Sequence, residues 1–554
     1  ERTVGELTTK EQLRMDCFGG EGGYLIYTHD QTAGPLEIPE ISVNDYALRH
    51  AKRLGDKAAL IDGPSGNALS YADLQIQVGQ AATGLAARGF RKGDVLAIYC
   101  PNVPEYAVVF NAVAQLGGIN TTINPLYTAR ELLNQLNDAS ARFLVTTPLF
   151  LDKALEAVIE SSVEEIFVLG EATGATPFSD LLSVGDSPPD VTINPRDDLV
   201  VLPYSSGTTG LPKGVMLTHH NLVANLCQFH GFESQPRLEE NDIVLAVLPF
   251  FHIYGMVVVM KLALAHGATV VTMPRFDMAD FLALIQRYRI TTLPMVPPMV
   301  LGLAKSPLVD QYDLSSLRTL FCGAAPLGAE LSIEAGNRVG CPVVQGYGMT
   351  EASPVTHLSP KNAKNGRPGS IGKVIPMTEV RIVDVDSGAD QGPNAEGELW
   401  IRGPQIMRGY LNQATATADS IDENGWYRTG DIGYADEDGF FYIVDRVKEL
   451  IKYKGLQVSP AELEALLLTH PEIIDAAVIP IPDEEAGELP KAYVVTRTGD
   501  LDNEPLAAQI MAFMAELVSP HKRIRVIEFC SEIPKSASGK ILRRVLVEQT
   551  RSGT

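Results

Sequence analysis

The stretch that decides how this sequence folds reads Tyr204-Ser205-Ser206-Gly207-Thr208-Thr209-Gly210-Leu211-Pro212-Lys213-Gly214. It follows an apolar run at residues 199–202 and precedes residues 218–223, whose leading hydroxyl and apolar periodicity predict a capped helix. We therefore expect a loop between a strand and a helix. Its glycines let backbone N–H groups point at one anion, its hydroxyls add donors, and Lys213 adds positive charge. The pattern predicts a phosphate-binding loop.

Two other interpretations of this loop are weaker. A Walker A loop does not fit, because Pro212 precedes the lysine and Gly214 follows it. A flexible linker rich in Gly, Ser and Thr seldom stands between an apolar strand and a capped helix. A local anion site therefore remains the favoured interpretation.

Length and composition restrict the class of protein. The 554-residue chain is too long for one hydrophobic core, which predicts about two to four domains. The formal net charge of -23 argues against non-specific nucleic-acid binding, since an acidic surface repels phosphate backbones. The six cysteines are scattered without metal-ligand spacing, and no signal peptide, membrane span or peroxisomal ending is recognisable. We expect a cytoplasmic protein, monomeric or homodimeric.

Helical and strand patterns alternate along most of the chain, which predicts parallel sheets covered by helices and an α/β fold class. The helical patterns cover residues 45–54, 71–88, 106–116 and 278–288. The strand patterns cover residues 58–62, 95–99, 142–146, 165–169, 243–247, 268–273, 291–296 and 318–322.

The pattern also suggests how the domains are divided. Residues 170–197 are rich in Pro, Ser, Gly and Asp, and we expect this surface connection to separate two sheets. After about residue 376, short strands with turn signals predict a small β-rich lobe, for example at 380–384 and 397–401. We predict an N-terminal arm at 1–37 that packs late or not at all, a large domain at 38–446, and a small mobile α/β domain at 447–554.

Two loops after strands contain candidate ligand-binding residues. His252 lies in an aromatic loop that ends in Gly255, and loops after parallel strands are where ligands bind. Gly323, Ala324 and Ala325 follow a predicted strand, and their small side chains would let backbone approach a flat ligand. Each segment is equally compatible with a structural histidine or a tight turn when considered alone.

Residues 345–352 carry a more specific signal. A hydroxyl beside a carboxylate, Thr350 and Glu351, suits Mg²⁺ held against ATP phosphates, because magnesium takes few protein ligands. Tyr347 offers a flat face, and Asp431 further along offers two acceptor oxygens for vicinal ribose hydroxyls. A solvated Glu after a turn and an Asp that forms a turn are the alternatives.

Two charged segments complete the set. Residues 445–458 would be a solvated charged hairpin if they stood alone. Residues 533–540 end in Gly539-Lys540, and a lysine on such a loop tip supplies an ammonium group that can stabilise charge developing on a phosphate.

Taken together and in this order, the seven motifs resemble the adenylate-forming superfamily of acyl-CoA synthetases, luciferases and peptide-synthetase adenylation domains. Residues 205–214, 252–255, 345–354 and 452–457 look most like 4-coumarate-CoA-ligase-like enzymes. The resemblance covers nearly the whole chain. One departure is Ser536, where the family usually has Thr.

The resemblance implies an ATP-dependent carboxylic acid–CoA ligase with Mg²⁺ as cofactor and CoA as co-substrate. It implies that Lys540 catalyses adenylation, that Lys448 is the hinge, that Thr209 and Glu351 hold the metal, and that His252 closes on the acyl site. Lys452 and Gln457 would act in thioester formation, with Lys454 and Gly455 at CoA. The implied ATP or AMP contacts are Ser205, Ser206, Gly207, Thr208, Thr209, Gly210, Lys213, Gly323, Ala324, Ala325, Gln345, Gly346, Tyr347, Gly348, Thr350, Asp431 and Arg446.

The identity of the acid is left open, although a hydrophobic aryl-propenoic or medium-chain acid is expected. The expected pocket walls are Tyr254, Met295, Val296, Gly323, Gly346, Gly348, Pro354 and Val355. Transfer to a carrier-protein thiol and luciferase-like oxidation share the ATP site and remain alternatives. Amino-acid activation is disfavoured because residues 250–252 contain no Asp, and a non-catalytic nucleotide sensor is disfavoured because Glu351 and Lys540 are both present.

Overall fold

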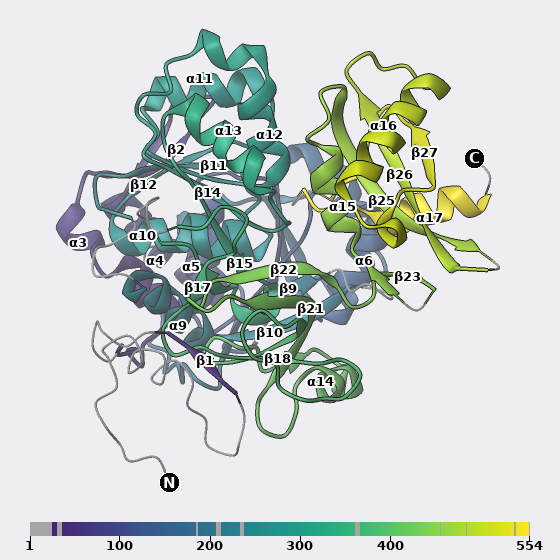
Figure 1. The fold of residues 1–554 in the computed structure, drawn as a ribbon. Coiled ribbons are helices and arrows are strands. Elements are labelled where there is room, and N and C mark those ends of the chain that lie inside the picture. The colour runs from purple at the N-terminus through teal and green to yellow at the C-terminus, as the bar shows by residue number, and fades with distance from the viewer. Residues whose placement is uncertain are drawn as a thin grey trace, which may run out of the picture.

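A computed structural model describes residues 25–29, 36–183, 185, 187–205, 212–232, 238–360, 366–454, 456–483, 485–536 and 539–552. Three sheets build the large domain and a fourth builds the small C-terminal domain (Figure 1). In Figure 1 the yellow-green C-terminal elements stand beside the teal helices α12 (Pro297–Lys305) and α13 (Ala329–Val339).

The first sheet has eight strands in the order β20-β10-β9-β5-β4-β6-β7-β8. The strands from β9 to β8 run parallel, whereas β10 pairs antiparallel with both β9 and β20. The bounds are β4 Val95–Tyr99, β5 Ile119–Thr122, β6 Ala141–Thr146, β7 Glu165–Val168, β8 Thr176–Pro177, β9 Leu199–Ser205, β10 Lys213–Thr218 and β20 Gly409–Tyr410.

The second sheet has nine strands in the order β17-β16-β15-β14-β13-β11-β12-β2-β3, and its six central strands are parallel. Antiparallel pairing occurs only toward its two ends among the described strands. The bounds are β2 Ala58–Asp62, β3 Ala68–Ser70, β11 Ile243–Ala246, β12 Thr269–Thr272, β13 Thr292–Met295, β14 Thr319–Cys322, β15 Val343–Gly348, β16 Val355–Leu358 and β17 Lys373–Val374.

One hydrophobic cluster joins these two sheets through the helices between them, so they fold as one body. The helix η3 (Tyr254–Lys261) is a π-helix whose eight residues are all buried. The other helices of the large domain are α2 Val43–Leu48, α3 Ala51–Leu54, α4 Tyr71–Ala87, α5 Glu105–Gln115, α6 Ala129–Asp138, η2 Pro148–Phe150, α7 Leu151–Val158, α8 Ser179–Leu182, α9 His219–Gly231, α10 Leu262–His266, α11 Met278–Tyr288, η4 Pro307–Gln311, η5 Thr350–Ala352 and α14 Ala414–Ser420.

The β-rich lobe is a third, antiparallel sheet with the order β1-β18-β19-β21-β22. Its first strand lies inside the predicted N-terminal arm and pairs with β18, so this part of the arm is packed. The bounds are β1 Tyr27–Thr28, β18 Glu379–Val383, β19 Gly397–Arg402, β21 Tyr427–Ala435 and β22 Phe441–Arg446.

The small domain is an α/β unit with hydrophobic clusters of its own. Its strand order is β24-β23-β26-β25, with β27 parallel to β26. The bounds are β23 Ile451–Tyr453, β24 Leu456–Val458, α15 Pro460–Leu467, β25 Ile473–Asp483, β26 Gly487–Thr496, α16 Glu504–Leu517, η6 Pro520–Lys522, β27 Val526–Phe529 and α17 Arg543–Ser552. The predicted α/β class, with a β-rich lobe and a C-terminal α/β domain, is confirmed.

Three local predictions were wrong. The phosphate-binding loop leads into a strand, β10, and only then into the helix α9, because Val215 and Leu217 bury their side chains while β10 pairs back on β9. Residues 170–197 do not separate two sheets, since β8 and β9 belong to the same sheet. The helix predicted over 45–54 is broken after Leu48, where Arg49 Nη1 donates to the Tyr46 carbonyl.

Candidate active site

The predicted site residues lie on loops and strand ends of several elements. Ser205 ends β9, Glu351 lies just beyond β15, and Asp431 and Arg446 pair across β21 and β22. In open α/β sheets, ligands bind beyond the carboxyl ends of the strands. Residues 206–211 lie outside the described residues, and they include the predicted nucleotide contacts Ser206, Gly207, Thr208, Thr209 and Gly210.

A hydrogen-bonded group surrounds Glu351 at the base of the phosphate-binding loop. Ser205 Oγ donates to Glu351 Oε1 at 3.0 Å, and the Tyr410 hydroxyl donates to the same oxygen at 2.9 Å. Lys213 Nζ lies 4.7 Å from the centroid of the Tyr410 ring. Glu351 is buried, and its backbone carbonyl accepts from Met407 N. The carboxylate is therefore held in one orientation.

A second group links Tyr347, Asp431 and Arg446. The Tyr347 hydroxyl donates to Asp431 Oδ2 at 2.5 Å, and Arg446 Nε lies 2.9 Å from Asp431 Oδ1. Burial raises the pKa of Tyr347 well above its usual value, and the Asp431 charge adds to this effect. The phenol therefore stays protonated and can donate. The arrangement orients one carboxylate through both of its oxygens.

The small-residue turn follows β14 as predicted. Ala324 has a φ of 73°, a left-handed conformation that side chains rarely adopt, and it is exposed. Gln345 is buried, and its side-chain amide donates weakly to the Leu327 carbonyl at 3.4 Å. Thr350 is buried beside Glu351 at the start of η5.

Two of the predicted acyl-pocket residues, Gly346 and Tyr254, contact the ring of Phe321, which the sequence did not single out. A Cβ on Gly346 would lie 2.7 Å from Phe321 Cζ, and Tyr254 packs edge-on against the same ring. The Tyr254 hydroxyl donates to the Phe321 carbonyl at 3.0 Å. A Cβ on Gly348 would lie 2.0 Å from the carbonyl oxygen of Pro354, so only glycine fits there. Met295, Val296 and Val355 are buried on neighbouring strands or at their ends.

His252 lies just before the π-helix, with its Nδ1 accepting from Tyr254 N at 3.3 Å. Burial lowers the pKa of His252 to about 4, so the imidazole is neutral near pH 7. With Nδ1 as acceptor, the neutral ring carries its proton on Nε2. Such a histidine can donate one hydrogen bond without carrying charge.

Lys540 reaches the same region from the small domain. A Cβ on Gly539 would lie 2.8 Å from Val296 Cγ2, and one on Gly328 would lie 3.7 Å from Ala465 Cβ in α15. The two domains are therefore in contact here. Burial and the Arg446 guanidinium lower the pKa of Lys540, while Glu449 and Asp431 act in the opposite direction. Lys540 thus interacts electrostatically with Arg446 and Asp431.

The predicted CoA-facing residues are not part of this group. The backbones of Lys452 and Gln457 pair across β23 and β24, and the Lys452 backbone N donates to Glu488 Oε2 at 2.7 Å. Lys454 pairs with Glu485 on the surface, and Gly455 lies outside the described residues. These contacts of Lys452 and Lys454 lie within the small domain.

Contacts around Lys448 change from one domain to the other. Val447 N donates to Gly430 O in the β-rich lobe, whereas Glu449 pairs with Arg543 of α17 at 2.5 Å. Asp445 also reaches the small domain, because Ser459 Oγ and Ala461 N donate to its Oδ2. Lys448 therefore lies within a short segment, residues 445–449, that contacts both domains.

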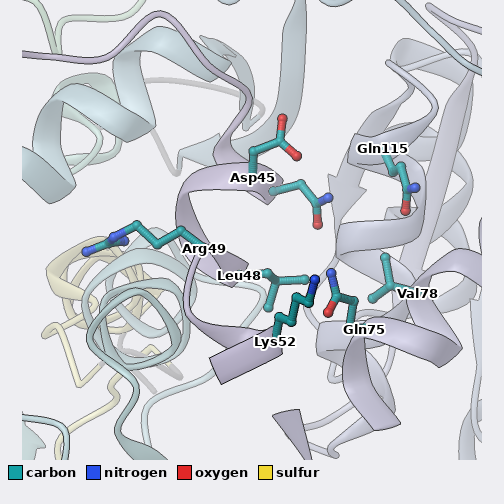
Figure 2. Close-up of a pocket in the computed structure, with 8 residues that line it drawn as sticks. Asp45, Leu48, Arg49, Lys52, Gln75, Val78 and Gln115 are labelled. Carbon is teal, nitrogen blue, oxygen red and sulfur yellow. The ribbon is translucent and has the colours of Figure 1, made fainter. Parts of the chain in front are cut away.

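Two cavities have linings that do not include Glu351, Ser205 or Tyr410. One of about 300 Å³ is lined by residues of α2, α3, α4 and α5, and Figure 2 shows Lys52 and Gln75 directed toward each other while Arg49 points away. None of the predicted site residues lines it. The other, of about 510 Å³, opens beside Gln345, Ser332 and Arg367. No group of three or more His, Cys, Asp or Glu side chains is placed to hold a metal in the described part of the chain.

The comparisons with known proteins cover most of the chain. The AMP-binding enzyme family matches residues 48–411, and its C-terminal domain family matches residues 462–540. The chain is 44% identical to 4-coumarate–CoA ligase 1 of Petroselinum crispum over 527 residues, 94% of this chain and 96% of that protein. It is 44% identical to 4-coumarate–CoA ligase 1 of Solanum tuberosum over 550 residues, 98% and 99% of the two chains.

Solved structures agree with this result. An anthranilate CoA ligase in complex with anthranoyl-AMP has a TM-score of 0.84 and 28% identity, covering 95% of this chain and 99% of that one. ATP-bound MatB from Rhodopseudomonas palustris has a TM-score of 0.81 and 28% identity, covering 92% and 99%. Within the described residues, no helix is long and apolar enough to cross a membrane.

Proposed function

Because the chain belongs to the AMP-binding enzyme family, as its motifs predicted, we propose that it joins a carboxylic acid to CoA through an acyl-adenylate. The observation that carries the proposal is the meeting of three groups from distant parts of the chain. Ser205 donates to Glu351, Asp431 pairs with Arg446, and the charge of Glu351 acts on Arg446. The charges of Arg446 and Asp431 in turn act on Lys540 of the small domain, which supports one common site.

In the first step, a carboxylate oxygen of the acid attacks the α-phosphorus of ATP, and the bond to pyrophosphate breaks. The residues act mainly by positioning and by neutralising charge. Lys213 and the loop before it hold phosphate, Asp431 accepts from the ribose hydroxyls, and Lys540 meets the negative charge that develops around the α-phosphate. Tyr347 and the turn at Gly323 flank the adenine.

Glu351 would hold Mg²⁺, together with Thr209, and the donor set fits this ion. Both donors to the carboxylate use Oε1, and among the described residues nothing donates to Oε2. Magnesium prefers oxygen ligands and keeps several waters, so one free carboxylate oxygen suffices. When bound, the ion neutralises phosphate charge.

In the second step, the CoA thiol loses its proton, its sulfur attacks the acyl carbonyl carbon, and AMP leaves. The hairpin of Lys452 and Gln457, with Lys454 and Gly455, would serve this step after the small domain rotates about Lys448. In this proposal, the orientation in which Arg446 and Asp431 act on Lys540 serves adenylation. The division into arm, large domain and small domain at residues 37 and 446 remains a prediction, as do a cytoplasmic location and a monomeric or homodimeric state.

The favoured substrate is a hydrophobic monocarboxylic acid, aryl-propenoic or medium-chain. Tyr254, Phe321, Met295 and Val355 give apolar walls, and no charged side chain is among them to pair with a second carboxylate. The test is a coupled assay with acetate, hexanoate, octanoate, cinnamate and 4-hydroxycinnamate, with and without CoA. Best turnover on acetate, or adenylate that CoA never consumes, would contradict the proposal. The second outcome would favour a carrier-protein acceptor or luciferase-like oxidation.

A further inference from the structure

Tyr410 stands between the two charged side chains that define the base of the ATP site. Its hydroxyl donates to Glu351 Oε1 at 2.9 Å, and the centre of its ring lies 4.7 Å from Lys213 Nζ. The ring is buried and the residue belongs to β20. One side chain therefore contacts both the predicted metal ligand and the predicted phosphate-binding cation.

The hydroxyl fixes how Glu351 is presented. Ser205 Oγ donates to the same oxygen, Oε1, from the other strand end. Two donors on one oxygen restrict rotation of the carboxylate, and within the described part of the chain Oε2 accepts no hydrogen bond. Because hydrogen bonds to a charged group are strong, the carboxylate is pre-set with Oε2 available to a cation.

The ring has a different effect on Lys213. An ammonium group over an aromatic face is attracted by the ring's quadrupole without being neutralised. Among the described residues, Lys213 makes no ion pair with any carboxylate, and Tyr410 is its only ring contact. The aromatic side chain thus attracts the ammonium group without neutralising its charge, so Lys213 stays available for phosphate.

Tyr410 is itself held firmly. Its backbone N donates to Thr417 Oγ1 at 2.9 Å, and the next residue, Leu411, donates through its N to Gly214 O at 2.8 Å. Val215 of β10 pairs directly with Tyr410. The strand that follows the phosphate-binding loop therefore carries Tyr410 in a fixed register.

We propose that Tyr410 is a positioning residue that keeps Glu351 free for a divalent cation and Lys213 free for phosphate. The proposal rests on the proposed function, since it concerns the same ATP site. Two substitutions separate the effect of the hydroxyl on Glu351 from the effect of the ring on Lys213. Tyr410→Phe keeps the ring and loses the hydroxyl, whereas Tyr410→Leu loses both.

The experiment measures binding of α,β-methylene-ATP by calorimetry, with and without Mg²⁺, in the full-length protein. In Tyr410→Phe, the affinity for the nucleotide without metal should change less than about twofold. The Mg²⁺ concentration that gives half of its full effect on nucleotide affinity should rise about tenfold. In Tyr410→Leu, binding without metal should also weaken, by about threefold or more.

The matched control is Tyr71→Phe. It removes a buried hydroxyl that donates to Ala268 O at 2.6 Å, away from the site, so it should lower the melting temperature without changing metal dependence. Wild-type metal dependence in Tyr410→Phe would overturn the proposal, as would an equal change in the Tyr71 control. If the wild-type protein bound no Mg·nucleotide and released no pyrophosphate, the proposed function itself would fail, which is a separate result.

Discussion

Replacing Lys540 with alanine tests whether this lysine acts only in the first half-reaction. The backbone N of Lys540 donates to Ser536 Oγ at 3.1 Å, Ser536 N donates to the Lys540 carbonyl at 2.8 Å, and Gly539 has a φ of 79°. This turn fixes the backbone of Lys540 beside Gly539, where a Cβ would lie 2.8 Å from Val296 Cγ2 of the large domain. The lysine side chain therefore starts from a fixed point close to the large domain.

The expected loss follows from this geometry. Removing one preorganised charge contact to a developing anion costs about 3 kcal/mol, which is about 100-fold in rate. Folding stability should hardly change, because burial and the neighbouring Arg446 both disfavour the charged form of Lys540 and lower its pKa. We expect pyrophosphate release to fall about 100-fold while CoA consumes supplied acyl-adenylate at the normal rate.

The assay compares the two half-reactions directly, with Lys535→Ala as the control. Lys535 lies five residues earlier in the same loop, but it pairs with Asp475 inside the small domain at 2.5 Å. A partly exposed pair of this kind contributes at most about 1 kcal/mol, so both half-reactions should stay within about twofold of wild type. Equal losses in the two half-reactions of Lys540→Ala would refute the assignment.

The fold class could be predicted from sequence because its signal is local. Strands such as Ala58–Asp62 and Val95–Tyr99 were found with their observed bounds, since buried parallel strands are short apolar runs flanked by turn residues. The strand β10 was missed because its apolar part spans only residues 215–217. Its register depends on pairing with β9 across a loop rich in glycine.

The motif residues could be proposed from sequence because each motif is a short string, whereas the residues that contact them in the structure could not. Tyr410 reaches Glu351 across 59 positions, and Ser205 reaches it across 146. Phe321 looked like an ordinary strand residue, although its ring lies over Gly346. Long-range packing of this kind leaves no periodic or compositional trace in a single sequence.

Three further predictions concern the hinge, the acyl pocket and acid stability. Lys448→Pro should spare pyrophosphate release and abolish CoA transfer, because proline fixes φ where the chain must swing, and unchanged overall turnover would place the hinge elsewhere. Gly346→Ala should lower the free energy of unfolding by about 1–3 kcal/mol and reduce cinnamate turnover, because the added Cβ clashes with Phe321. Gly323→Ala should be tolerated, because its Cβ would meet nothing nearer than 3.4 Å. Burial lowers the pKa values of four histidines from 6.5 to about 4 or about 3: His219, His252, His266 and His357. The unfolded chain therefore binds more protons than the folded one, so stability that is fully present above pH 6.5 is lost as the pH falls toward 4, by about 1.4 kcal/mol per pH unit for each histidine. Burial raises the pKa of the Glu464 carboxyl to about 7, and this group acts in the opposite direction. Denaturant unfolding between pH 7 and pH 5 should show the net decline, and His266→Gln should make it shallower. A free energy of unfolding that does not change over this range would contradict the assignment of these histidines as neutral.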